Sequence, residues 1–145
     1  MLSTSRKLNR LLAIHCRSLP MYMLDAGSWR SDAPKESDLL QLMNNIVVGH
    51  RNISQRIAQT IMDVGGVVSP GPFPMVFTDM NFLSLDFMVR EVLELQRRDI
   101  AEIESLVRGL SDVPEAKAIA QEALGEARAH LEALQAAVGA APVAT

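Results

Sequence analysis

The segment 65–79, which reads GGVVSPGPFPMVFTD, constrains the fold of this chain more than any other stretch. It contains three glycines and three prolines and has no helical periodicity. On both sides of it, apolar residues recur every three or four positions, which indicates long amphipathic helices. A connection of this length needs a structural reason. The simplest reason is that the segment travels the height of a helical bundle, so that the helices on either side run parallel.

The first two helices follow from the apolar periodicity of the N-terminal half. The first covers about residues 4–26 and contains Pro20, which removes the amide that would bond to the Cys16 carbonyl and is expected to kink the helix. The second carries an apolar stripe over residues 39–64 and ends at the glycine pair that opens the long segment. A polar linker is expected between the two helices.

The C-terminal half predicts two more helices. The third is expected to begin with Thr78 or Asp79 as its cap and to continue to about Leu110. The fourth follows a Ser111–Asp112 cap and Pro114, which suits a first helical turn. The predicted architecture is therefore all-α, with two antiparallel helix pairs joined by one long crossover. That topology is the ferritin-like branch of the four-helix bundles.

Composition supports one helical domain and limits its partners. The 145-residue chain is 48% hydrophobic but only 4% aromatic, a profile that favours helices over strands. We expect a single domain over residues 1–138 with a flexible tail over 139–145. The net charge of −3 gives no reason to expect nucleic acid, and no apolar run is long enough to cross a membrane. A single cysteine suits a reducing compartment, so we expect a cytoplasmic protein.

The histidines are the residues that point to chemistry. His15, His50 and His130 all fall on inward faces, each on a different predicted helix. Imidazole is the commonest neutral metal ligand, and bundle interiors are where such sites are built. The pattern predicts that the three converge on one transition-metal ion, which could be Fe, Zn or Cu. The alternative is that each histidine is satisfied by a backbone carbonyl or buried water, and the carbonyl freed by Pro20 is one candidate.

A carboxylate ligand is harder to assign. Glu126 lies one turn before His130 on the same side of the last helix, so this pair could bind a metal ion together. On the third helix, periodicity places Gln96 inward and Asp99 at the border of the same stripe, whereas Glu94 falls on the polar face. The choice among these three side chains stays open.

Short motifs resemble the ferritin-like superfamily of bacterioferritins, rubrerythrins and mini-ferritins. The first predicted helix is similar to the bacterioferritin helix that carries Leu-Leu-Ala, one residue and a metal-binding Glu; the matching residues here are Leu11, Leu12, Ala13 and His15, followed by Tyr22, Ala26 and Trp29. QRIAQTIMDVGGV resembles the mini-ferritin helix that ends in Gly-Gly, and EALGEARAHLEAL resembles the last bacterioferritin helix.

The resemblance implies a ferritin-like fold with a role in metal handling or oxidative stress, and it changes the expected ligands. His15 stands at the family's glutamate position, and spacing from His130 puts Glu94 at the bridging-glutamate position. The departures are that Gln55 and Gln59 replace two acidic ligands, and that Ala127 and Val47 replace the glutamates of Glu-x-x-His motifs. A di-iron site needs about four carboxylates. We therefore expect an atypical histidine-rich site rather than a ferroxidase centre, and the sequence does not decide whether the protein is an enzyme.

A second hypothesis is a metal-free ferritin-like module that acts through a dimer interface. Residues 81–89, NFLSLDFMV, are apolar on nearly all sides, and such a helix must be buried on both faces. Phe82, Leu83, Phe87 and Met88 therefore predict a homodimer or higher homo-oligomer that forms through the start of the third helix. The alternative is that PFPMVF of the crossover folds over this patch.

Overall fold

The computed structural model describes residues 3–25, 37–80 and 84–140, and within these ranges every regular element is a helix. The elements are α1 (Thr4–Cys16), α2 (Leu19–Asp25), α3 (Ser37–Asp63), the 3-10 helix η2 (Met75–Met80), α4 (Leu85–Gly109) and α5 (Pro114–Ala140). The all-α prediction is confirmed. Within the same ranges, no helix combines the length and the apolar character that crossing a membrane requires.

The expected first helix is two helices, not one kinked helix. α1 ends at Cys16, where the Arg17 amide donates to the Ala13 carbonyl, and α2 begins at Leu19. Pro20 lies in the first turn of α2, where its missing amide is tolerated. The Ser18 hydroxyl accepts a hydrogen bond from the Met21 amide at 3.4 Å and so caps the new helix. The proline therefore starts a helix instead of bending one.

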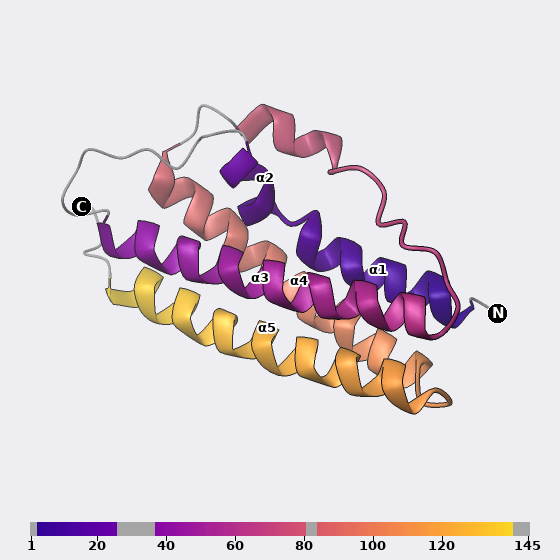
Figure 1. The fold of residues 1–145 in the computed structure, drawn as a ribbon. Coiled ribbons are helices and arrows are strands. Elements are labelled where there is room, and N and C mark those ends of the chain that lie inside the picture. The colour runs from indigo at the N-terminus through magenta and orange to yellow at the C-terminus, as the bar shows by residue number, and fades with distance from the viewer. Residues whose placement is uncertain (1–2, 26–36, 81–83, 141–145) are drawn as a thin grey trace.

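The long crossover starts at a helix stop that the sequence predicted. The Gly66 amide donates to the Ile61 carbonyl and the Gly65 amide to the Met62 carbonyl, with Gly65 at φ 82°, which is the Schellman pattern. The chain then runs back along the helices through η2, so that α3 and α4 point the same way while α1 and α5 run opposite to them (Figure 1). The parallel direction of the helices that flank the crossover agrees with the prediction.

Two expected helix caps are wrong. α4 is capped by Ser84, whose hydroxyl accepts from the Phe87 amide at 3.3 Å, and not by Thr78 or Asp79, which lie in η2. Because η2 is a separate 3-10 helix, the crossover is longer than expected and has structure of its own. Ser111 donates to the Arg108 carbonyl at the end of α4 rather than capping α5, which begins at Pro114.

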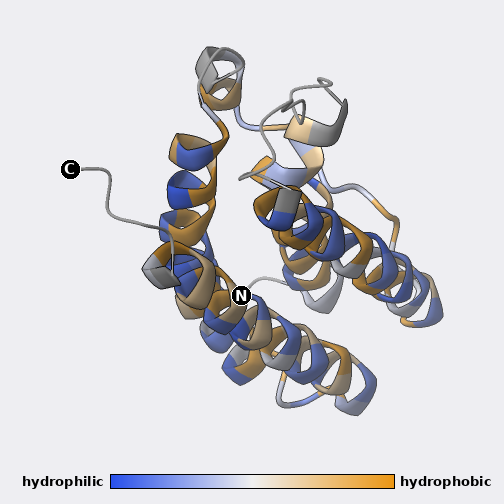
Figure 2. Cartoon of the chain, turned by 90° about the vertical axis from the view of Figure 1, so that its left-hand side faces the viewer, coloured by the Kyte–Doolittle hydropathy of each residue, from blue (hydrophilic) through white to orange (hydrophobic). Residues whose placement is uncertain are grey.

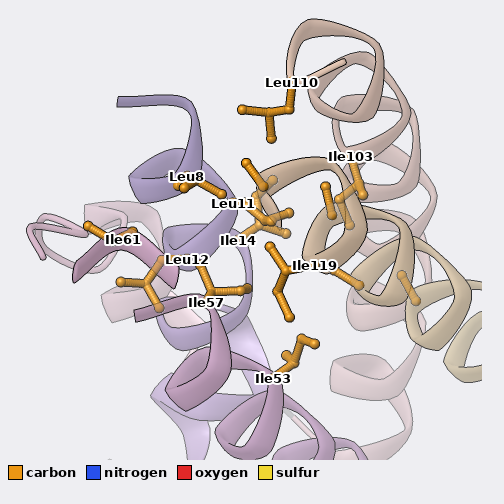
Figure 3. Close-up of a cluster of buried hydrophobic side chains, with 14 of the residues drawn as sticks. Leu8, Leu11, Leu12, Ile14, Ile53, Ile57, Ile61, Ile103, Leu110 and Ile119 are labelled. Carbon is orange, nitrogen blue, oxygen red and sulfur yellow. The ribbon is translucent and has the colours of Figure 1, made fainter. Parts of the chain in front are cut away.

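The helices bury two apolar clusters, one at each end of the molecule. The first joins α1 to the second half of α3, the end of α4 and the start of α5, where leucines and isoleucines point toward one another (Figure 3). The second joins α2 to the first half of α3, the start of α4 and the end of α5. The helices are amphipathic, with hydrophobic and hydrophilic residues alternating along their turns (Figure 2). Burial of these faces is the main stabilising term for such a fold.

The start of α4 is partly covered by the crossover. Met88 is only 1% exposed and packs in the second cluster together with Phe77 of η2, so it is not available as the interface residue that the sequence suggested. Phe87 is 44% exposed. Phe82 and Leu83 lie outside the described residues. The homodimer itself stays a prediction.

Candidate functional site

A layer of buried polar side chains separates the two apolar clusters. His15, His50 and Gln96 are 2%, 3% and 5% exposed. His50 and Gln96 each lie, along their own helices, between a residue of one cluster and a residue of the other. His50 lies between Ile46 and Ile53, and Gln96 lies between Leu93 and Ile100. A polar layer inside a helical core is costly unless its groups are satisfied.

The three histidine rings lie next to one another in this layer, and their convergence on one metal ion stays a prediction. The ring centroids of His15 and His50 lie 5.3 Å apart with their planes at 83°. Those of His50 and His130 lie 5.7 Å apart with their planes at 54°. His50 on α3 is therefore the central member of the cluster, between a ring from α1 and a ring from α5.

The imidazoles of this cluster have few hydrogen-bond partners. Within the described residues, both ring nitrogens of His15 and the Nδ1 of His130 are buried without a partner. His50 Nδ1 lies 2.8 Å from Ser18 Oγ, and in the tautomer in which Nδ1 donates, its Nε2 keeps a free lone pair. The Cys16 carbonyl accepts from the Arg17 guanidinium at 3.5 Å, not from an imidazole.

Burial keeps the imidazoles neutral. It lowers the pKa of His15 to about 4, with a smaller effect from His130. It also lowers the pKa of His50 well below its ordinary value, assisted by His15 and His130, and it lowers the pKa of His130. Neutral imidazole is the form that binds metal ions. The cluster is thus held in its ligating protonation state at neutral pH.

Glu126 stands beside the cluster because α3 has a glycine where α5 crosses it. Glu126 Oε1 lies 3.7 Å from His130 Nε2, and burial raises the pKa of the Glu126 carboxyl. A Cβ on Gly49 would lie 2.8 Å from His130 Cε1 and closer still to Glu126 Oε1. With any larger residue at position 49, the ends of the Glu126 and His130 side chains would have to shift.

The three side chains considered on the third helix have different positions. Glu94 is exposed and pairs with Arg97 at 2.6 Å, so the structure does not bring it to the imidazoles. Gln96 is in the polar layer, and its Nε2 donates to the Ala127 carbonyl at 3.0 Å. Asp99 is half-buried and lines a pocket that His50 also lines. The position expected from family spacing is therefore wrong for Glu94, because that residue lies on the polar side of α4.

Two of the three ring–ring separations can be compared with the spacing that a shared metal ion requires. With metal–nitrogen bonds of about 2.0–2.1 Å and tetrahedral angles, the centroids of two ligating imidazoles lie about 5.2 Å apart. The two measured separations are close to this value. As the side chains stand, no group of three or more His, Cys, Asp or Glu residues in the described part of the chain is arranged to hold a metal ion. Binding would therefore require the rings to turn so that their nitrogens converge.

Sequence reasoning missed two residues of this site. Ser18 holds His50 Nδ1, and its signal was a serine two residues before a proline, a common start for a helix. Gly49 makes room for the Glu–His pair, and its signal was an isolated glycine inside a helical pattern, which costs about 1 kcal/mol relative to alanine.

Comparison of the chain with protein-family models, with curated proteins and with solved structures returns no match in any of the three.

Proposed function

We propose that this chain is a metal-binding protein in which His15, His50 and His130 bind one transition-metal ion inside the helical core. The observation that carries the proposal is that both ring nitrogens of His15 are buried without a partner, next to two further neutral imidazoles. Each unsatisfied buried group costs about 1–3 kcal/mol. A metal ion would satisfy several of these nitrogens together.

Glu126 is the fourth ligand that this proposal favours. Its carboxylate is beside His130, and it would add negative charge to a set of neutral imidazoles. Three imidazoles and one carboxylate suit Zn²⁺, Cu²⁺ or Fe²⁺. Ser18 would fix the orientation of His50 from outside the ligand set, as hydrogen-bonded partners of ligating histidines do.

The proposal includes a ferritin-like four-helix bundle. The crossover that makes α3 and α4 parallel supports this topology, and so does the packing of α1 against α3 and of α4 against α5. α2 is then the detached end of the first bundle helix. On this basis we propose a role in metal handling or in protection against oxidative stress.

The deciding experiment is metal analysis of the protein purified without a histidine tag and without chelators. We expect about one equivalent of Zn, Cu or Fe per chain, and restoration of binding when the metal-free protein is titrated with Zn²⁺ or Co²⁺. Binding should weaken as the pH falls toward about 4, the value to which burial lowers the pKa of His15, because protons then compete for the imidazoles. Absence of metal together with absence of binding in the titration would show that the polar layer is a structural feature only.

Gly49→Ala should weaken metal binding without unfolding the protein. The new Cβ must displace Glu126 and His130, whose clashing atoms are the ends of side chains that can move. Alanine also favours a helix by about 1 kcal/mol over glycine. We expect a loss of about 10–100-fold in Zn²⁺ affinity with the helical signal retained. Gly125→Ala on α5 is the matched control, since a Cβ there has no neighbour within 4 Å, and it should bind as the wild type does.

The second candidate function, a metal-free module that acts through self-association, is favoured by exposed apolar side chains near the start of α4. Met75 and Val76 of η2 are 86% and 57% exposed, and they adjoin the segment that packs on α4.

Phe87→Glu should shift a dimer toward monomer in sedimentation experiments, because a charge at an apolar contact is desolvated. Val48→Glu is the control, because Val48 is also exposed but lies on α3, and this change should leave the dimer intact. A monomer at high concentration in the wild type would contradict the prediction.

A further inference from the structure

A pocket of about 260 Å³ opens beside the polar layer, where the chain leaves α1 and enters α2. Its walls are largely apolar and come from α1, α2, α4 and the proline-rich crossover, with Ile14, Leu19, Phe77 and Leu95 among them. Binding pockets for small molecules range over roughly 300–1,000 Å³ and combine apolar walls with a few polar groups. This pocket therefore suits a ligand about the size of one ring.

Some polar groups of the pocket have hydrogen-bond or ion-pair partners, and one does not. Arg10 is paired with Glu102 through two nitrogens, and Arg17 donates to the Gly71 carbonyl at 2.6 Å and lies over the Phe73 ring. Asp99, by contrast, has no hydrogen bond and no ion pair within 4 Å among the described residues. The carboxyl group of Asp99 is thus the polar group of this pocket that lacks a direct partner.

We propose that this pocket binds a small organic amine with an apolar body, whose ammonium group donates hydrogen bonds to the Asp99 carboxylate. The ammonium would make charge-assisted hydrogen bonds, which are the strong ones. Its apolar body would pack between the crossover prolines and the side chains of α4. This ligand is separate from the metal ion and needs no metal for its binding.

The charged and titratable groups around Asp99 come from α1, α3 and α4 and from Arg17 between α1 and α2. Besides burial, Glu102 on α4 raises the pKa of Asp99 and Arg10 on α1 lowers it, and the effect of Glu102 is the larger of the two. The imidazole of His50 on α3 is neutral, and the guanidinium of Arg17 is held at the crossover. Burial raises the pKa of Asp99 to about 7, so the carboxyl is partly protonated at neutral pH. Binding of an ammonium group should therefore drive a proton off Asp99.

The test uses three ring compounds of the same size: benzylamine, benzyl alcohol and benzoate. Calorimetry and NMR titration of the full chain should show benzylamine binding at about millimolar affinity or tighter, with the neutral and anionic analogues about tenfold weaker or more. The calorimetric enthalpy near pH 7 should depend on the buffer, because Asp99 releases a proton. Shifts should map to the amides of Ala13, Leu95 and Asp99.

Two variants assign the binding to this pocket. Asp99→Asn keeps the shape of the side chain and should lose benzylamine binding by about tenfold or more. Asp86→Asn, which changes an exposed acid on the same helix, should not. Ala13→Leu fills the pocket but keeps the carboxyl, so it should also weaken binding. The proposal is overturned if benzoate binds as well as benzylamine, if Asp99→Asn binds normally, or if no shifts appear up to about 10 mM amine.

Discussion

His50→Ala is expected to abolish binding of Zn²⁺ and Co²⁺, with a loss of about 100-fold or more in affinity. His50 is the central ring of the cluster, at 5.3 Å from His15 and 5.7 Å from His130 by their centroids. It is also the ring whose Nδ1 is held by Ser18, so its Nε2 is the best oriented of the available nitrogens. Without it, two imidazoles and a carboxylate would have to span a gap from opposite sides.

The measurement is a titration of metal-free protein with Co²⁺, followed by its visible absorption, which reports on coordination geometry. Ser54→Ala is the matched control, because this buried hydroxyl lies one turn from His50 on α3 and has no partner among the described residues. Circular dichroism should show both variants to be helical. Unchanged Co²⁺ binding by His50→Ala would show that the metal binds elsewhere, and the histidine layer would then be structural.

Periodicity was sufficient to predict which residues face the core, and this in turn brought the histidines together. An apolar stripe that repeats every three or four positions fixes the buried face of a helix to within a fraction of a turn. His15 and His50 both fall inside such stripes, and both are almost completely buried. The long crossover then predicted the relative directions of α3 and α4, but it did not predict the level at which rings from α1, α3 and α5 meet.

The predictions that were wrong concern positions where neighbouring residues offer similar sequence signals. Ser18 and Ser84 cap helices at positions where other residues were expected to continue or to begin them. Helix-capping residues are common in loops, and which one is used depends on where the chain can turn against its neighbours. Glu94 was placed by family spacing, whereas the periodicity of the same helix puts it on the exposed side of α4, where it pairs with Arg97.

The pocket and the Gly49 contact could not be read from the sequence because both arise between elements. The Gly49 gap is defined by side chains of α5, almost eighty positions away along the chain. The pocket exists because two non-helical residues separate α1 from α2 and because the crossover passes over this interruption. Such contacts follow from the tertiary packing of particular atoms and have no periodic signature.

Acidification from pH 7 to pH 4 is expected to destabilise the metal-free protein, and the histidine layer is the cause. The folded pKa of His15 is about 4, whereas that of an unfolded histidine is about 6.5. Above pH 6.5 neither state binds the proton, so the protonation of His15 does not change the free energy of unfolding there. Between pH 6.5 and 4 only the unfolded state binds it, and stability is lost progressively, by about 3 kcal/mol from His15 alone. His50 and His130 act in the same direction.

Two carboxyl groups oppose this effect. The folded pKa of Asp99 is about 7, well above the ordinary value of 3.8, so between these values only the folded state holds the proton. Its contribution to stability is therefore largest at low pH and is lost as the pH rises toward 7. Glu126 acts in the same direction, since burial raises its pKa. Three histidines lose stability on acidification and two carboxyl groups gain it, and we expect the histidines to dominate because His15 and His50 are both almost completely buried.

Asp99→Asn separates the two contributions, because it removes the larger opposing group and leaves the histidines in place. We expect its free energy of unfolding at pH 8 to exceed that of the wild type by about 2–4 kcal/mol, since an ionised buried carboxylate is no longer required. Its stability should also fall more steeply between pH 6.5 and 4. Urea denaturation of metal-free protein across this range measures both quantities, with Asp86→Asn as the control for an exposed acid. A flat profile in Asp99→Asn would mean that the histidines bind protons as readily in the folded state as in the unfolded one. Zn²⁺ should raise stability at pH 7 and should raise it progressively less as the pH falls toward 4, because metal binding and proton binding compete for the same imidazole nitrogens.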